Sequence, residues 1–277
     1  MNFSDGEWRS LIDNATIRAA RLGGASPVDT DQLDVTRLQP PDSVVYQLRT
    51  PIEDVSDGDP VTTWPAGIGS PDGQNGTDLA YSEGAFGDRD AVSSNSSDAS
   101  LNIGSDSVNV IGDSTFAWAI CLQTTNSEWG MGYRADDPER SEVSMRYEDG
   151  TVEFAVIGAE TDNDLTVIRE TSIFADIELD DGTPRAIVWN RDFSDSGTGW
   201  EIWAGEQGGE ISELETEIDS GFEDADDFFA PADTDDDMFL WKVPFEPNME
   251  GSISHFELAD DILSPTEISG FHSRAFL

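Results

Sequence analysis

The sequence is short of cysteine and of long apolar runs. Cys121 is the only cysteine, so the chain cannot form an internal disulfide, and its apolar surroundings predict a small buried residue. No run of 18 apolar residues is present, so no insertion into a membrane is expected. The first residues, Met1 to Glu7, carry neither the basic nor the apolar stretch of a signal peptide.

Positive charge is equally scarce. The 277 residues include 58 Asp and Glu but only 14 Lys and Arg, of which Lys242 is the single lysine, and the formal net charge is −44. Such a chain repels a phosphate backbone, which excludes nucleic acid as a partner. Its self-repulsion opposes folding in dilute buffer, but molar salt shortens the Debye length to about 3 Å and screens it. Because 37% of the residues are hydrophobic, with 8 Trp and 14 Phe, we expect a folded halophilic protein rather than a disordered one.

The groups that most enzymes use for catalysis are also few. His255 and His272 are the only histidines, and neither adjoins a nucleophile elbow or a Cys/His metal spacing. The nearest match to a glycosidase carboxylate pair is Glu217-Ile218-Asp219-Ser220-Gly221-Phe222-Glu223. Its last acid is one residue too far along, and Ser220-Gly221 would interrupt the strand. We therefore expect no enzymatic activity, and we expect His255 to be a packing residue.

An amphipathic helix is predicted near the N-terminus. Ser4-x-x-Glu7 fits a capping box, and Gly23-Gly24 would end the helix. Its apolar face consists of Trp8, Leu11, Ile12, Ala15, Ala19 and Leu22. With the proline-containing linker that follows, residues 1–42 are predicted to form an arm that anchors a homo-oligomer by packing on a neighbouring subunit. The alternative is that the helix packs on its own domain, residues 43–277.

The rest of the sequence consists of short strands separated by Gly, Asp, Asn and Ser clusters, with residues 61–97 predicted to be loop-rich. In Thr115–Gln123, large residues alternate with Ala117, Ala119 and Cys121, which is typical of a central strand packed on both faces. A capping box at Ser264 predicts a short final helix. Without βαβ alternation, the pattern favours an all-β sandwich or jelly roll. The predicted strands are Val44–Arg49, Ala99–Ile103, Val108–Ile111, Thr115–Gln123, Val143–Tyr147, Thr151–Ile157, Leu165–Arg169, Pro184–Asn190, Trp200–Ala204, Met238–Val243 and Gly251–Leu258.

Three segments resemble the laminin-G-like, concanavalin A-like lectin and glucanase domains. The first runs from Val61-Thr62-Thr63-Trp64-Pro65 through Arg89-Asp90-Ala91-Val92 to Ala99-Ser100-Leu101, and the second is Gly112-Asp113-Ser114-Thr115-Phe116-Ala117-Trp118. The third is the closing Gly251–Leu258 strand followed by Leu263-Ser264-Pro265-Thr266-Glu267-Ile268. The resemblance spans residues 43 to 271 and implies a two-sheet concanavalin A-like jelly roll whose first and last strands are neighbours. It leaves function open, because this fold carries lectins, adhesion modules, virion proteins and glycosidases.

Sugar recognition would use aromatic rings as apolar platforms beside polar groups. Trp129, Tyr133, Trp200 and Trp203 fall in or near predicted loops and hairpin ends and are the candidates, with core packing as the alternative. Trp64, Trp118, Trp189 and Trp241 lie where buried positions are expected.

Calcium is the one ion that the sequence and the resemblance suggest. Asp233, Asp235, Asp236 and Asp237 supply hard oxygen ligands in an acidic stretch that does not match an EF-hand loop. The alternative is a solvated acidic loop of a halophilic surface.

Together these features predict a surface protein of a haloarchaeal virus, such as a capsid turret, spike or tail fibre. The expected partners are other virion proteins and a host cell-surface glycan or glycoprotein. Assembly would take place in the host cytoplasm, and the mature protein would lie on the extracellular virion surface. The alternatives are a purely structural virion component, a glycosidase or polysaccharide lyase, and a haloarchaeal cell-surface protein.

Overall fold

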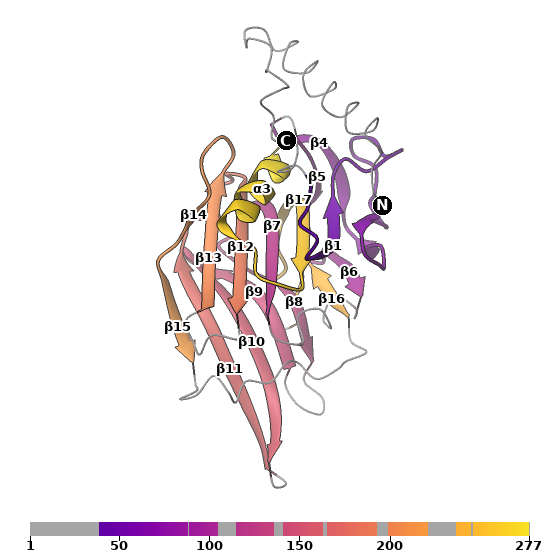
Figure 1. Ribbon diagram of the computed structural model, residues 1–277. Helices are drawn as coiled ribbons and strands as arrows, with labels where there is room; N and C mark the ends of the chain where they lie inside the picture. The colour runs from indigo at the N-terminus through magenta and orange to yellow at the C-terminus, as the bar shows by residue number, and fades with distance from the viewer. Residues whose placement is uncertain are drawn as a thin grey trace.

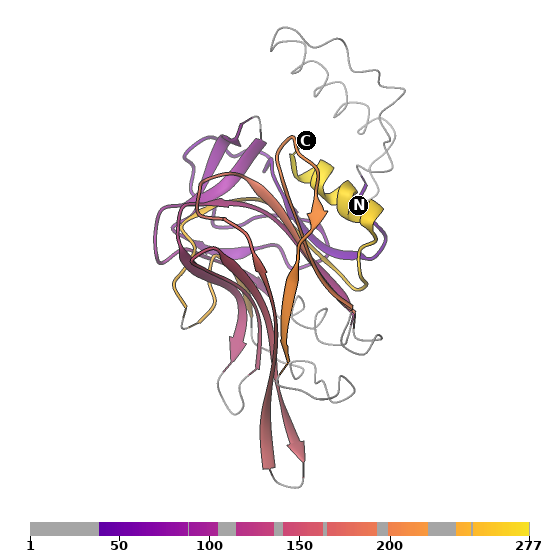
Figure 2. The same cartoon turned by 90° about the vertical axis from the view of Figure 1, so that its left-hand side faces the viewer.

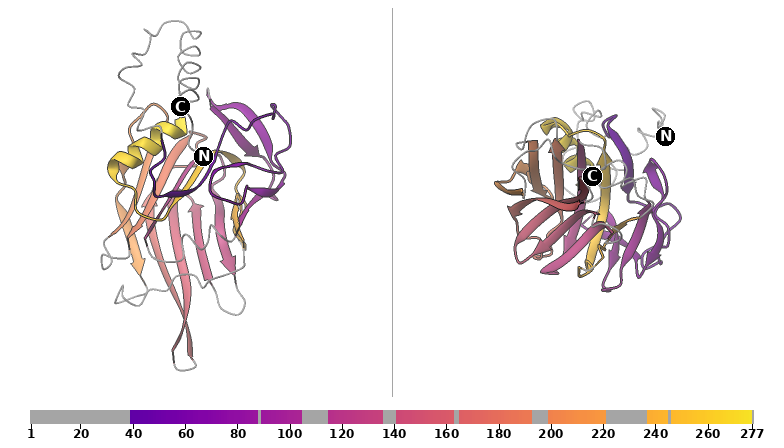
Figure 3. Two further views of the ribbon diagram at one scale, coloured as in Figure 1. Left: turned by 45° about the vertical axis from the view of Figure 1, so that its right-hand side comes forward. Right: turned by 90° about the horizontal axis from the view of Figure 1, so that it is seen from below.

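The computed structural model describes residues 39–87, 89–104, 115–135, 141–162, 165–192, 199–220, 237–244 and 246–276. They form two antiparallel β-sheets packed face to face, with one C-terminal helix, α3 (Pro265–Phe276) (Figure 1). The two layers are also seen from below in Figure 3. The predicted β-sandwich is thereby confirmed. The predicted N-terminal helix and the strand Val108–Ile111 lie outside the described residues.

The first sheet has nine strands. Seven follow the order β14-β13-β12-β7-β17-β1-β2, while β5 pairs with β17 and β4 with β5. The first strand β1 lies beside the last strand β17, as the resemblance implied, with Leu48 opposite Phe256. The bounds are β1 Val44–Arg49, β2 Ala66–Ile68, β4 Ala80–Phe86, β5 Arg89–Ser94, β7 Phe116–Thr124, β12 Arg185–Asp192, β13 Gly199–Glu206, β14 Ser212–Glu213 and β17 Gly251–Ala259.

The second sheet has eight strands in the order β15-β11-β10-β9-β8-β16-β6-β3. The bounds are β3 Gln74–Thr77, β6 Ser100–Gly104, β8 Glu128–Ala135, β9 Ser141–Glu148, β10 Thr151–Asp162, β11 Leu165–Asp176, β15 Thr216–Ser220 and β16 Met238–Leu240. Residues 61–97, predicted to be loop-rich, also contain the four strands β2 to β5. These strands are short, polar and partly exposed, so they lack the apolar alternation by which a strand is recognised.

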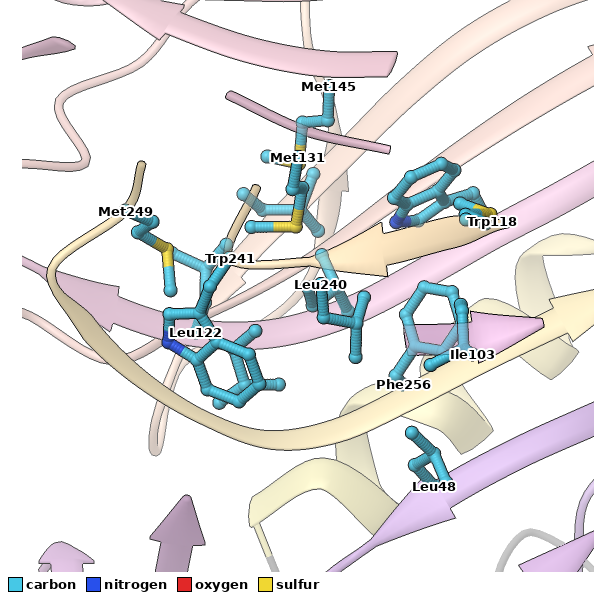
Figure 4. Packing of buried hydrophobic residues seen from close by; sticks show 14 of the residues in the cluster. Leu48, Ile103, Trp118, Leu122, Met131, Met145, Leu240, Trp241, Met249 and Phe256 are labelled. Atoms are coloured by element: carbon cyan, nitrogen blue, oxygen red, sulfur yellow. The ribbon is translucent and has the colours of Figure 1, made fainter. Parts of the chain in front are cut away.

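The main core fills the space between the sheets. Met131 and Met145 from the second sheet meet Trp118, Leu122 and Phe256 from the first (Figure 4). Trp64, Trp118, Trp189 and Trp241 are all fully buried, as predicted. A second, smaller core covers the other face of the nine-stranded sheet, where α3 packs (Figure 2).

Strand β7 shows why the nine-stranded sheet is covered on both faces. Phe116, Trp118, Ile120 and Leu122 enter the main core, whereas the intervening small side chains, such as Ala119 and Cys121, face α3. Small residues let the helix approach the sheet closely. Ser264 starts α3 as predicted, because its hydroxyl and Glu267 exchange capping hydrogen bonds, with the Glu267 carboxylate accepting from the Ser264 backbone N–H at 2.8 Å.

A closed polar network lies under α3. The Glu257 carboxylate, 1% exposed, accepts hydrogen bonds from Gln47 Nε2 at 2.7 Å and from Arg274 Nη2 at 2.8 Å. Nε2 of His255 lies 2.8 Å from Glu257 Oε1, so His255 is a buried residue of this network. Burial lowers the pKa of His255. Because these groups are sealed between helix and sheet, they hold α3 in place rather than face a ligand.

The β10–β11 hairpin is longer than its neighbours. Among the described residues, strand β10 pairs with β9 as far as Ile157, and β15 pairs with β11 from Thr171 onward. The two strands continue to pair with each other out to Asp162 and Leu165. The end of the hairpin is therefore a two-stranded ribbon that projects beyond the sheet (Figure 1).

Candidate functional site

Three of the four aromatic rings expected to form a sugar platform are buried in the sandwich. Trp129 and Tyr133 are each 1% exposed and Trp200 is 7% exposed, and all three belong to the main core. Core packing, the alternative, therefore describes these three rings: Trp129 and Tyr133 lie within β8, and Trp200 lies near the start of β13, where a strand was predicted. Trp129 also lines a surface cavity, described below.

Trp203, the fourth ring, lies on the opposite face of β13 from Trp200. It is half-buried on the outer face of the nine-stranded sheet and packs against the second core. Its indole N–H donates to the Glu201 carboxylate at 2.9 Å. Trp203 therefore helps to cover the sheet beside α3 and does not join Trp129 in one surface.

The predicted calcium ligands are described only at their last member. Asp233, Asp235 and Asp236 lie outside the described residues, whereas Asp237 accepts a hydrogen bond from Asn102 Nδ2 at 2.5 Å. Within the described part of the chain, no three His, Cys, Asp or Glu side chains are placed to hold a metal ion. No helix in that part is long and apolar enough to cross a membrane.

The structure places a polar cavity on the outer face of the eight-stranded sheet, where β8, β9, β10 and β11 run side by side. Its volume is about 470 Å³, within the range of roughly 300–1,000 Å³ typical of small-ligand sites. We call it the Arg146 cavity. It is lined by Glu128, Trp129, Arg146, Tyr147, Glu148, Asp149, Thr151, Glu153, Phe174 and Glu246.

A tight turn sets the register between β9 and β10, the two strands at the centre of this cavity. Asp149 and Gly150 both have positive φ, 45° and 94°, which is the geometry of a two-residue type I′ hairpin. The turn pairs Glu148 with Thr151, so Arg146 lies directly opposite Glu153. The next strand brings Phe174 opposite Glu153 from the other side. A guanidinium, a carboxylate and an aromatic ring therefore lie in a row across three strands.

Arg146 is the centre of the charge network. Its Nη2 is hydrogen-bonded to Oε1 of Glu142, which is fully buried, and its Nη1 lies 3.7 Å from Oε2 of Glu153. Its Nε lies 3.9 Å from Oε1 of Glu246. Burial alone would lower the pKa of Arg146, but these three carboxylates outweigh burial and raise it. The guanidinium therefore keeps its charge and a fixed position.

Two serines hold the carboxylates in turn. The Ser144 hydroxyl donates to Glu142 at 2.5 Å, and the Ser172 hydroxyl donates to Glu153 at 2.6 Å. Each carboxylate is thus oriented by a neighbour on the same face of the sheet, which limits the reorganisation needed when a ligand arrives.

Gly130 allows Glu246 to reach the Arg146 cavity. A Cβ at this position would lie 2.6 Å from Val243 Cγ1 and 3.1 Å from Glu246 Cβ. Because glycine leaves that space open, Val243 and Glu246 lie against β8, and the Gly130 N–H donates to Pro247 O at 2.9 Å. Glu246 is thereby brought to Arg146.

The cavity combines the two kinds of contact that a sugar needs. Phe174 is half-buried, so part of its ring is open as an apolar surface. Carboxylates accept hydrogen bonds from hydroxyl groups, and a guanidinium donates to hydroxyl or ether oxygens. The sequence analysis did not identify Arg146, Glu153, Phe174 or Glu246 as site residues. The Asp149-Gly150 turn was a usable signal, because a two-residue hairpin at this dipeptide places Arg146 opposite Glu153.

A second cavity, of about 350 Å³, surrounds Arg185 on the nine-stranded sheet. Both Nη atoms of Arg185 bind Asp181, at 2.7 and 2.9 Å, and Nη2 also binds Glu206 at 2.9 Å. This cavity is smaller and has no aromatic residue in its wall. The Arg146 cavity is therefore the stronger candidate for a binding site.

Comparison with known proteins gives no match to a protein-family model and none to a curated protein by sequence. The fold is similar to that of the botulinum neurotoxin serotype G binding domain, at 13% identity and a TM-score of 0.53, over 83% of this chain and 50% of that one. It is also similar to the binding domain of botulinum neurotoxin DC in complex with SialylT, at 9% identity and a TM-score of 0.51, over 84% and 52%. This chain spans about half the length of both domains. At these identities the likeness establishes the β-sandwich fold alone.

Proposed function

We propose that this chain is a carbohydrate-recognition module that binds a sugar in the Arg146 cavity. The observation that carries the proposal is the row of Phe174, Glu153 and Arg146 across the outer face of one sheet, in a cavity large enough for a sugar ring. The fold adds support, since one of the similar neurotoxin binding domains was solved in complex with SialylT.

The same geometry favours binding over hydrolysis. A glycosidase needs two carboxylates that flank the scissile bond, one of them able to donate a proton. Here Glu142 and Glu153 flank a guanidinium instead of an open space, and Glu142 is fully buried. The module is therefore proposed to have no enzymatic activity.

The proposed setting is the surface of a halophilic virion, with a host cell-surface glycan or glycoprotein as the partner. The support comes from composition: a net charge of −44 with one lysine suits a protein that works in molar salt. In this proposal the chain is a homo-oligomer and contacts other virion proteins, with the N-terminal residues Trp8 to Leu22 as the assembling arm.

The cavity is tested by a pair of phenylalanine variants. Phe174→Ala removes the aromatic wall and should weaken sugar binding about tenfold, because an aromatic contact contributes roughly 0.5–1.5 kcal/mol beyond its buried area. Phe239→Ala is the matched control, since Phe239 is a half-buried residue of β16 in the same sheet but not in the cavity wall. Binding to a glycan array at molar salt gives the readout. Equal binding by the two variants would refute the proposal.

The setting is tested on intact haloarchaeal cells at molar salt. Labelled protein should bind saturably, and released surface glycans should abolish the binding. If a folded, assembled protein shows no binding, a structural role in the virion becomes the better explanation.

A further inference from the structure

The rim of the Arg146 cavity is formed by acidic side chains. Glu128, Glu148 and Asp149 are exposed at the end of the β8–β9–β10 segment, and all three line the cavity. Glu128 and Glu148 are direct cross-strand partners. Like charges directly opposite each other on one face of a sheet destabilise the pair. The rim therefore concentrates negative charge at the point where a ligand would enter.

The one base in the cavity wall does not offset this rim. Arg146 is already hydrogen-bonded to Glu142, which is buried beneath the wall, and it faces Glu153 and Glu246 within 4 Å. Arg146 is the only basic residue among the described residues that line the cavity. The described residues of the wall carry five carboxylates against this one guanidinium, a net formal charge of −4.

We infer that the Arg146 cavity selects sugars that carry no acid group, namely neutral sugars and protonated amino sugars. This inference rests on the proposed function of the cavity. A sugar carboxylate or sulfate would come within a few ångströms of Glu128, Glu148 or Asp149, where molar salt screens the repulsion only in part, because the Debye length of about 3 Å is itself of that size. A hydroxyl group can donate to the same carboxylates, and an ammonium group can do so with its charge favoured.

A site with an open positive charge would show the opposite preference and bind acidic sugars more tightly. Recognition of acidic sugars relies on arginine or lysine donors that are open to the ligand. In this cavity the single arginine is surrounded by carboxylates of the protein itself, so its positive charge is balanced before any ligand binds. Neutral hydroxyl groups can still accept from it or bridge to its carboxylates.

The test uses methyl glycosides that differ at one group, which is neutral, cationic or anionic. The hexose, the amino sugar and the uronic acid of the gluco, galacto and manno series are each measured by saturation-transfer NMR and calorimetry with the full chain at molar potassium chloride. Where a hexose binds, its uronic acid should bind more weakly, by up to about fivefold for each rim carboxylate that it approaches, since an unscreened charge contact is worth about 1 kcal/mol in water and molar salt screens part of it. The amino sugar should bind at least as tightly as the hexose.

Variants of the rim show whether its charge, rather than the fit of the sugar in the cavity, weakens binding of the uronic acid. The double change Glu128→Gln and Glu148→Gln should narrow the difference between hexose and uronic acid, while Glu213→Gln, an exposed acid on the other sheet, should leave it unchanged. If wild-type protein binds the uronic acid as tightly as the hexose, the inference is overturned and the proposed function stands. If a folded protein binds none of the panel, the proposed function fails, and the inference fails with it.

Discussion

Replacing Glu257 with glutamine should cost a large part of the protein's stability at neutral pH. Glu257 lies under α3, where Arg274 donates to both carboxylate oxygens, from Nε at 3.2 Å and from Nη2 at 2.8 Å. Glu257→Gln keeps the size of the side chain but removes its charge, and Arg274 is 6% exposed. The variant therefore removes the counter-charge that Glu257 supplies to a buried guanidinium.

The expected magnitude comes from the pKa of Glu257. Burial alone would raise this pKa, but the hydrogen bond and charge of His255 and the charge of Arg274 outweigh burial and lower it from 4.5 to about 2. One pKa unit corresponds to about 1.4 kcal/mol, so the shift represents roughly 3 kcal/mol of stability. Removing one partner of a buried ion pair costs about 3–5 kcal/mol, which agrees with this figure.

The effect of Glu257→Gln on stability should depend on pH. Because the folded-state pKa lies below the unfolded value, the stabilisation is fully present above pH 4.5 and is lost as the pH falls toward about 2. The difference in unfolding free energy between wild type and Glu257→Gln should therefore be largest at neutral pH and shrink across that window. Comparing two proteins at each pH cancels the titration of the surface carboxylates that both share.

Urea unfolding at constant molar salt, followed by tryptophan fluorescence, measures this difference. Glu53→Gln is the matched control, because Glu53 is an exposed acid and the change should alter stability by less than about 0.5 kcal/mol. The reasoning is refuted if Glu257→Gln is as stable as the control at neutral pH. It is also refuted if the difference between wild type and variant stays constant down to pH 2.

Three further predictions concern the rest of the sandwich. Gly132→Ala should cost at least about 2 kcal/mol by urea unfolding, because φ is +137° and a Cβ would lie 2.2 Å from Val143 O, whereas Gly150→Ala, with open space around it, should cost less. Cys121 is fully buried and burial raises its pKa to about 12, so a thiol reagent should react only after unfolding; reaction in native protein at the rate of an exposed thiol would contradict this. The thermal midpoint should rise with salt from dilute buffer to the molar range, because the net charge is −44, and a midpoint independent of salt would rule out self-repulsion as the cause.

The sequence predicted most of the sandwich because its central strands alternate strongly. The pattern of Phe116 to Gln123 predicted a strand covered on both faces, and the structure confirms it with the main core on one side and α3 on the other. The predicted strands Val143–Tyr147 and Thr151–Ile157 are also confirmed, and Asp149-Gly150 joins them because this dipeptide suits a turn in which both residues have positive φ.

The candidate site was predicted poorly, for two physical reasons. In β8 the large residues Trp129, Met131 and Tyr133 alternate with glycine, and no strand was predicted there, although the glycines mark where Val243, Glu246 and the Val143 backbone approach the strand. In addition, a chain with 58 acids offers no local mark that distinguishes Glu153 or Glu246 from a solvated surface residue. Their importance comes from proximity to Arg146, which is set partly by segments distant in sequence.

The projecting ribbon of β10 and β11 has a consequence for hydrogen exchange. Residues of β10 up to Ile157 have a hydrogen-bonded strand on both sides, whereas Gly158 to Asp162, within the part of the chain that the structure describes, pair with β11 alone. Exchange of a paired amide requires local opening, and a two-stranded ribbon opens at a lower free-energy cost than a strand inside a sheet. Amide deuterium uptake should therefore change sharply along a single unbroken strand, from slow before Ile157 to fast beyond it.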